Sequence, residues 1–221
     1  MADAAPVQLT AAAECYPAAL RRHLGEKSPA AVAAWGSLDL LRRPLLAFFC
    51  SVKCPGDELL ATYDLARALR DAGVAVIGGF HSPAEKECLE FLLRGTQPLV
   101  ICPARSLEGM RLPSAWRPAL SAGRLLLLSP FRAADRRATS DLARRRNELV
   151  AALSSGLFVA HAAPGSKTEA LARQALAWGK PVWALESANN RHLHAVGTRP
   201  LTAANAAEAW SRHLASIPTT D

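Results

Sequence analysis

Between residues 146 and 185 the sequence reads Leu157-Phe-Val-Ala-His161, then Ala163-Pro-Gly-Ser-Lys-Thr-Glu169, and finally Gly179-Lys-Pro-Val-Trp-Ala-Leu185. The first and last pieces are apolar runs typical of buried strands, and the middle piece is a glycine-containing turn that opens a helix reaching Trp178. We interpret the stretch as a strand–helix–strand unit. Such units bind phosphate at the turn, because the N–H groups at a helix start are unpaired and the helix dipole favours an anion.

The rest of the chain repeats this alternation. Apolar runs predict further strands at residues 30–35, 45–51, 74–78, 98–102 and 124–129. Helical patterns lie at residues 15–24, 57–72, 82–94, 114–122, 140–154 and 203–214, whereas 1–14 are expected to be frayed and 187–200 to form a loop. The pattern predicts an α/β fold, a Rossmann-like doubly wound and mainly parallel sheet of about six or more strands with helices on both faces.

Two parts of the chain are expected. Residues 1–42 are predicted to form an N-terminal lead-in packed on the core, and residues 43–221 the Rossmann-like domain. In the first helix of that domain, Asp57 or a neighbour is expected to cap the start and Leu60 to belong to the apolar stripe.

Composition narrows the function classes. The 221 residues are 50% hydrophobic and carry a net charge of +7 with a pI of about 9.6. Such a balance suits an anionic partner such as nucleic acid, nucleotide or phosphate; a solubilising arginine-rich surface is the alternative. No apolar run approaches the roughly 20 residues that cross a bilayer, and no signal peptide is visible, so we expect a soluble cytoplasmic protein without a membrane partner.

Motifs for common chemistries are missing. The sequence contains no Gly-x-Gly-x-x-Gly, Walker A, His-Glu-x-x-His or Cys-x-x-Cys pattern, which leaves dinucleotide oxidoreductases and P-loop NTPases with little support. The five cysteines fit buried reduced thiols better than a zinc site. We therefore expect no metal, no cofactor and no catalytic residues, and a role other than enzyme is favoured.

Several polar residues fall where strands end. His81 and His161 could contact a ligand there or serve the structure alone. Glu85 and Glu169 each follow a serine by three residues, which predicts two capping boxes; contact with a ribose hydroxyl or a glycosidic bond is the functional alternative. Arginines cluster at 132, 136, 137 and 144–146, but consecutive helical positions point to different faces, so at most one or two can share a site.

These residues together resemble the DprA/Smf family of DNA-processing proteins over roughly residues 15–214. The resemblance is carried by Tyr16-Pro17, Gly36-x-Leu38, Cys50-Ser-Val-Lys53, Gly78-Gly-Phe80, Arg146-Asn147 through Ser154, Gly165-Ser-x-Thr168, Gly179-Lys-Pro-Val182 and Ala195-Val-Gly-Thr198. The chain departs from the family pattern where Cys50 replaces the glycine of a Gly-Ser-Arg turn, Ser82 replaces a second glycine, and Glu148 replaces an arginine.

The resemblance implies a SLOG-type Rossmann-like domain that binds single-stranded DNA without chemistry and helps to load a RecA-type recombinase during DNA-mediated transformation. We expect phosphate or nucleotide to be bound by Ser51, Lys53, Gly79, Phe80, His81, Ser82, Glu85, Arg146, Asn147, Gly165, Ser166, Lys167 and Thr168. DNA is expected to contact Lys53, Arg144, Arg145 and Arg146. A RecA-type recombinase and a second copy of the chain are the candidate protein partners.

Two other functions stay open from the sequence. Pro164-Gly-Ser-Lys-Thr-Glu169 resembles a shortened Pro-Gly-Gly-x-Gly-Thr-x-x-Glu signature of the LOG-type phosphoribohydrolases, which release a base from a nucleoside monophosphate. A nucleotide-sensing domain of the SLOG kind is the third hypothesis.

Overall fold

One sheet runs through the whole molecule. The computed structural model describes residues 5–217, and their nine strands have the order β1-β2-β6-β5-β4-β3-β7-β8-β9. The strands are β1 (Val7–Thr10), β2 (Ala31–Gly36), β3 (Leu46–Phe49), β4 (Val76–Gly78), β5 (Leu99–Ile101), β6 (Leu125–Ser129), β7 (Gly156–Val159), β8 (Val182–Leu185) and β9 (Arg199–Leu201). All neighbours are parallel except β1–β2 and β2–β6. The predicted doubly wound, mainly parallel α/β class is confirmed.

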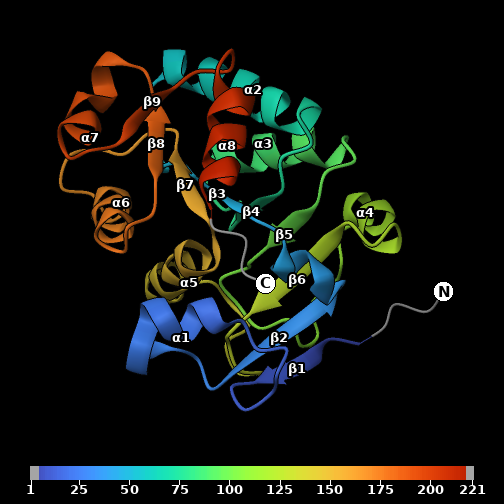
Figure 1. Ribbon diagram of the computed structural model, residues 1–221. Coiled ribbons are helices and arrows are strands. Elements are labelled where there is room, and N and C mark those ends of the chain that lie inside the picture. The colour runs from blue at the N-terminus through green and yellow to red at the C-terminus, as the bar shows by residue number, and fades with distance from the viewer. Residues whose placement is uncertain (1–4, 218–221) are drawn as a thin grey trace.

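Helices connect the parallel strands. They are α1 (Ala18–Leu24), α2 (Gly56–Asp71), α3 (Pro83–Leu93), α4 (Arg117–Ser121), α5 (Ser140–Leu153), α6 (Lys167–Ala177), α7 (Arg191–Ala195) and α8 (Ala206–Ser216), with short 3-10 helices η1 (Gly25–Lys27), η2 (Leu38–Arg42), η3 (Ser114–Trp116) and η4 (Ala188–Asn190). Figure 1 shows α1, α5 and α6 on one side of the sheet and α2, α3 and α8 on the other. Among residues 5–217, no helix combines the length and the hydropathy that a bilayer crossing needs.

Each face of the sheet has its own apolar core, because successive strand residues point to opposite faces. Ala47 and Phe49 of β3 pack with Leu149 of α5, whereas Leu46 and Phe48 pack with Leu65 of α2. Both faces are covered, which explains why the central strands are apolar throughout. Phe48 is fully buried and contributes about 1.5–3 kcal/mol through apolar burial.

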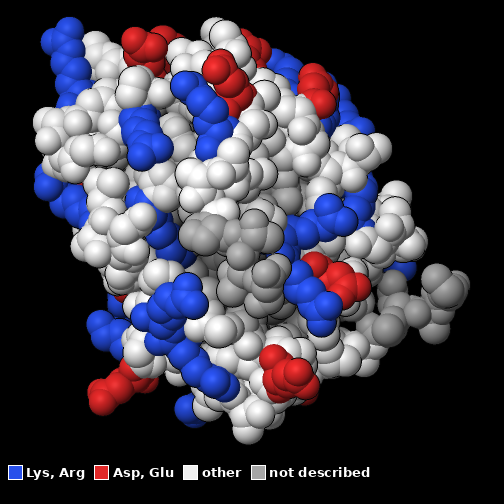
Figure 2. Space-filling model, in the orientation of Figure 1, with Lys and Arg blue, Asp and Glu red and all other residues white. Residues whose placement is uncertain are grey.

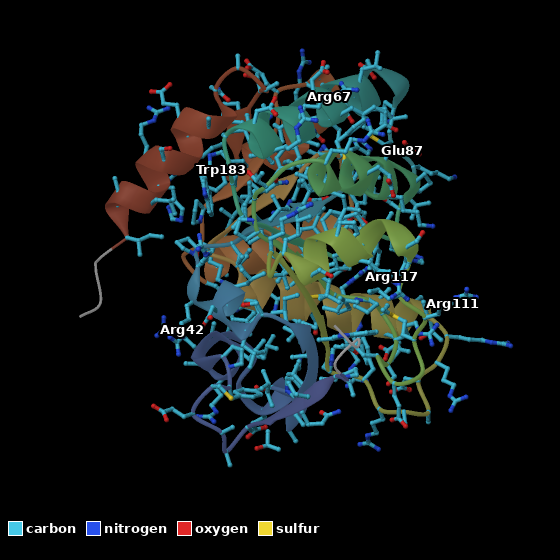
Figure 3. All side chains as sticks on the ribbon, turned by 90° about the vertical axis from the view of Figure 1, so that its right-hand side faces the viewer. Arg42, Arg67, Glu87, Arg111, Arg117 and Trp183 are labelled. Atoms are coloured by element: carbon cyan, nitrogen blue, oxygen red, sulfur yellow. The ribbon has the colours of Figure 1, made fainter. Side chains whose placement is uncertain are left out.

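Aromatic side chains close the second core at the β8 end. Trp183 packs edge-on against Trp210 of α8, with ring centroids 6.0 Å apart. Figure 3 shows Trp183 inside the molecule, while Arg67 and Glu87 lie on the outer helices α2 and α3. Arg67 holds its guanidinium 4.3 Å from the centroid of the Phe91 ring, which joins these two helices by a cation–π contact.

A buried lysine caps the C-terminal end of α5. Lys180 Nζ donates to the carbonyl oxygens of Ala151, Ala152 and Ser154 at 2.6–2.7 Å, and its side chain crosses the face of Trp178. These carbonyls have no partner within the helix, so the cation completes their hydrogen bonding and complements the dipole. The helix that carries Arg144, Arg145 and Arg146 is thereby fixed at its far end.

Four local expectations were wrong. Within residues 1–14, expected to be frayed, β1 pairs with β2, and within 187–200, expected to be a loop, lie η4, α7 and most of β9. Both strands are short and lie at the sheet edges, where a weak apolar pattern suffices because one side stays open to solvent. At α2, Pro55 holds the N-cap position and no side chain caps the helix start by a hydrogen bond, and Leu60 is 67% exposed.

The order in which the chain adds strands to the sheet reverses at β3. From this strand the chain adds β4, β5 and β6 on one side and later β7, β8 and β9 on the other. Ligands of open parallel sheets bind beyond the carboxyl ends of the strands at such a switch point, since the connecting loops diverge there. The residues following β3, β4 and β7 therefore define where the candidate site lies.

Candidate nucleic-acid interface

A cleft of about 490 Å³ opens at this edge, between the starts of α5 and α6. We call it the α5–α6 cleft. Val52 after β3 and His81 after β4 form one wall, and Arg144, Asn147 and Lys167 reach it from the two helices. The volume falls in the range of roughly 300–1,000 Å³ that holds a small organic ligand, and a single nucleotide is of that size.

The cleft gathers some of the residues expected from the sequence and omits others. His81, Arg144, Asn147 and Lys167 line it, together with unexpected polar residues Thr139, Ser140, Glu148 and Gln174. Ser140 and Glu148 each lie four residues from Arg144, so a search for polar helix faces could have found these two. Thr139 and Gln174 lie at no such interval from an expected residue.

Glu85 takes up the N–H groups that were expected to bind phosphate. Its Oε1 accepts from the amide of Cys50 at 2.9 Å, and its Oε2 accepts from the amides of His81 at 2.8 Å and Ser82 at 3.1 Å. The Ser82 hydroxyl accepts in turn from the Glu85 amide, which confirms the predicted capping box. A carboxylate of the chain itself thus occupies the anion-binding position at the start of α3.

Arg146 lies beneath the turn after β4 and is only 3% exposed. Its Nη1 donates to the carbonyl oxygen of Cys102 at 2.9 Å and its Nε to Oδ1 of Asn147 at 2.7 Å. Burial lowers the pKa of this guanidinium, and the nearby Glu85 carboxylate favours its charge. The structure places this expected DNA contact inside the fold, where it supports the wall of the cleft.

Phe80 gives the β4–α3 turn its shape. Its φ of 47° lies in the left-handed region, which non-glycine residues seldom adopt, and its ring is buried against Phe48. The reversal directs the next two amides back toward Glu85. Phe80, Ser82 and Glu85, all expected ligand residues, are buried.

The turn after β7 follows a related pattern. Ser166 caps α6 by accepting from the amide of Glu169, but the Glu169 carboxylate accepts from Gly165 at 2.6 Å and from Arg173, so the expected reciprocal box is wrong in this half. The Arg173 hydrogen bond holds the pKa of Glu169 below its usual range. The Ser51 hydroxyl donates to Thr168 Oγ1 at 3.3 Å, which joins this turn to the loop after β3.

His161 does not reach the cleft. Its Nδ1 lies 2.5 Å from Oε2 of Glu58, and both side chains are at most 10% exposed. The Ser187 hydroxyl donates to the other oxygen of Glu58. This cluster connects the carboxyl ends of β7 and β8 with the start of α2, which makes His161 part of the framework beside the site.

Comparisons with known proteins agree with this architecture. The sequence model of the DNA recombination-mediator protein A family matches residues 8–216 of the chain. The chain belongs to this family. A search of curated proteins finds no match.

Several solved structures have a fold similar to that of this chain. DNA processing protein A from Streptococcus pneumoniae is 19% identical, with a TM-score of 0.77 over 97% of this chain and 75% of that one. The Helicobacter pylori protein, described for its unique single-stranded DNA binding mode, is 19% identical, with a TM-score of 0.72 over 94% and 96%. A molybdenum cofactor binding protein from Rippkaea orientalis is 14% identical, with a TM-score of 0.55 over 78% and 98%.

In this member of the DNA recombination-mediator protein A family, the exposed cations of the site differ in their partners. Lys53 and Lys167 make no ion pair with residues 5–217, while Arg144 pairs with Asp141 and Glu148 at 2.7 Å each. Arg145 lies over the Phe131 ring at 5.5 Å. On the face shown in Figure 2, basic side chains are spread among acidic and neutral ones, with no single basic field.

Proposed function

We propose that this chain binds single-stranded DNA without chemistry, with the phosphate backbone held at the α5–α6 cleft. The observation that carries the proposal is that Lys167 lines the cleft and makes no ion pair among the described residues, with Lys53 in the adjoining loop in the same condition. The ammonium group of a lysine without an internal ion-pair partner is available to bind a phosphate. Family membership and the described property of the Helicobacter pylori protein point to the same ligand.

The acidic residues of the site support a role without catalysis. Glu85 accepts three backbone N–H groups, and Glu169 accepts Gly165 and Arg173. Carboxylate oxygens engaged by donors of the fold are not free to take a proton from a substrate, and the Arg173 hydrogen bond also lowers the pKa of Glu169. This arrangement favours binding over the phosphoribohydrolase hypothesis.

Family membership also suggests a cellular setting. We propose that the bound strand is passed to a RecA-type recombinase in the cytoplasm, during DNA uptake or recombination, and that a second copy of the chain takes part. The proposed contacts are His81, Asn147 and Lys167 of the cleft. With them we propose the residues of the loops after β3 and β7, namely Ser51, Lys53, Gly165, Ser166 and Thr168.

A fluorescence-anisotropy titration with labelled oligo-dT tests the proposal. The wild-type chain should bind, and affinity should fall steeply with salt because counterions are released from the DNA. The double variant Lys53→Gln/Lys167→Gln should bind more weakly by roughly tenfold and with a shallower salt dependence. The matched control is Arg42→Gln/Arg43→Gln, which removes the same charge immediately before β3, at the opposite edge of the sheet.

Equal weakening of both double variants would show that binding follows net charge and not the cleft. Absence of binding by the wild type at low salt would overturn the proposal. In that event, a rise in melting temperature with a free nucleotide would favour the nucleotide-sensing hypothesis, because a ligand stabilises the state that it binds.

A further inference from the structure

Two more cavities continue from the α5–α6 cleft around the first turns of α5. The next one, of about 370 Å³, lies between α1 and α5 and shares Arg144 and Glu148 with the cleft. The third, of about 670 Å³, lies beside β1 and β2 and shares Pro29, Pro130 and Arg145 with the second. Because neighbours share lining residues, the three cavities form one path along the surface.

Arginines form the ridges between the cavities. Arg144 separates the cleft from the second cavity, and Arg145 separates the second from the third. Phe131 is 5% exposed and supports the Arg145 guanidinium from below at 5.5 Å. A guanidinium held in place by a ring offers a planar cation on which a base can stack or a phosphate can bind.

The far part of the path is positively charged. Lys27 lines the second cavity and Arg132 the third, and neither side chain makes an ion pair with residues 5–217. Arg145 likewise makes no ion pair there. Glu108 is the acidic residue of the third cavity, so the two arginines that line it, Arg132 and Arg145, outnumber the anions there. A polyanion fits this part of the surface better than a neutral or acidic partner does.

We infer that the single strand continues from the α5–α6 cleft over Arg144 and Arg145 into the groove beside β1 and β2, so that this groove is a second DNA subsite. The inference rests on the proposed function, since it concerns the same ligand. Gln8 of β1 and Ala33 of β2 line this groove, which gives these two strands a part in binding. Long oligonucleotides occupy both subsites, while short oligonucleotides occupy the cleft alone.

The length of the oligonucleotide distinguishes the two subsites. We would titrate oligo-dT of about 5 and about 20 nucleotides against the wild type, Lys27→Gln/Arg132→Gln, and the Lys53→Gln/Lys167→Gln cleft variant. Lys27→Gln/Arg132→Gln should bind the short strand as the wild type does. It should bind the long strand roughly tenfold more weakly, with the slope of log K against log salt reduced by about 1.4 for two lost phosphates. The cleft variant should lose affinity for both lengths.

Each outcome decides something different. If Lys27→Gln/Arg132→Gln binds both lengths as the wild type does while the cleft variant is impaired, the second subsite is wrong and the proposed function stands. If the two double variants weaken both lengths equally, one undivided site exists and the inference fails. If the wild type binds neither length, both the proposed function and the inference fall.

Discussion

A Cβ atom built on Gly79 would lie 1.4 Å from Nη1 of Arg146. The glycine of the β4–α3 turn is therefore required by a buried arginine of the chain itself, whatever ligand the cleft binds. Arg146 cannot move aside freely, because Cys102 and Asn147 accept its hydrogen bonds.

Replacing this glycine should be costly. Gly79→Ala is expected to lower the free energy of unfolding by about 1–3 kcal/mol, the usual range for overpacking in a filled interior. Urea denaturation measures the change. Gly56→Ala is the control, because a Cβ there meets nothing within 4 Å. If the two variants are equally stable, Arg146 shifts away from the added methyl group without a loss in the free energy of unfolding.

The carboxylate of Glu85 should stabilise the fold more than any exposed acid of α3. Glu85→Gln replaces an oxygen acceptor by an amide donor facing backbone N–H groups and removes a negative charge near Arg146. We expect a loss of about 3 kcal/mol in the free energy of unfolding.

Glu87→Gln on the exposed side of the same helix is the matched control for Glu85→Gln. Its effect should stay within about 0.5 kcal/mol. Chemical denaturation of both variants checks the difference. If they unfold at the same denaturant concentration, the three amides do not depend on the carboxylate.

Stability should fall in mild acid through His23. Its ring packs at a tilt against Trp178 with centroids 5.0 Å apart. Burial, helped by Lys180 and Arg22, lowers the pKa of His23 to about 4. The unfolded chain binds this proton near pH 6.5, so it holds more protons than the folded chain between about pH 6.5 and 4. The folded state therefore loses stability as the pH falls through this window.

Melting curves at several pH values test the role of His23. His23→Phe keeps a ring on Trp178 and removes the titrating group, so its melting temperature should fall less between pH 6.5 and 4 than that of the wild type. Parallel curves for the two proteins would assign the acid sensitivity to other groups.

Glu148 should weaken DNA binding by holding Arg144. It accepts from Nη1 of Arg144 at 2.7 Å and lines two cavities of the proposed path. Glu148→Gln frees one side of the guanidinium and removes a charge that repels phosphate, so affinity for oligo-dT should rise about threefold. Anisotropy at constant salt measures the change. Glu90→Gln, an exposed acid of α3, is the control, and an equal rise there would indicate a general charge effect.

The sequence by itself determined the central architecture. The continuous apolar runs at 45–49 and 157–160 predicted buried parallel strands, because only a sheet covered on both faces needs apolar residues at every position. The Ser82–Glu85 capping box was equally readable, since all of its contacts lie within four residues. Tertiary structure alone decided which groups remain for a ligand. Glu85 reaches the amide of Cys50, 35 residues away, and Arg146 turns toward Cys102, 44 residues away. Such pairings depend on which strand ends become neighbours, and no local spacing encodes that.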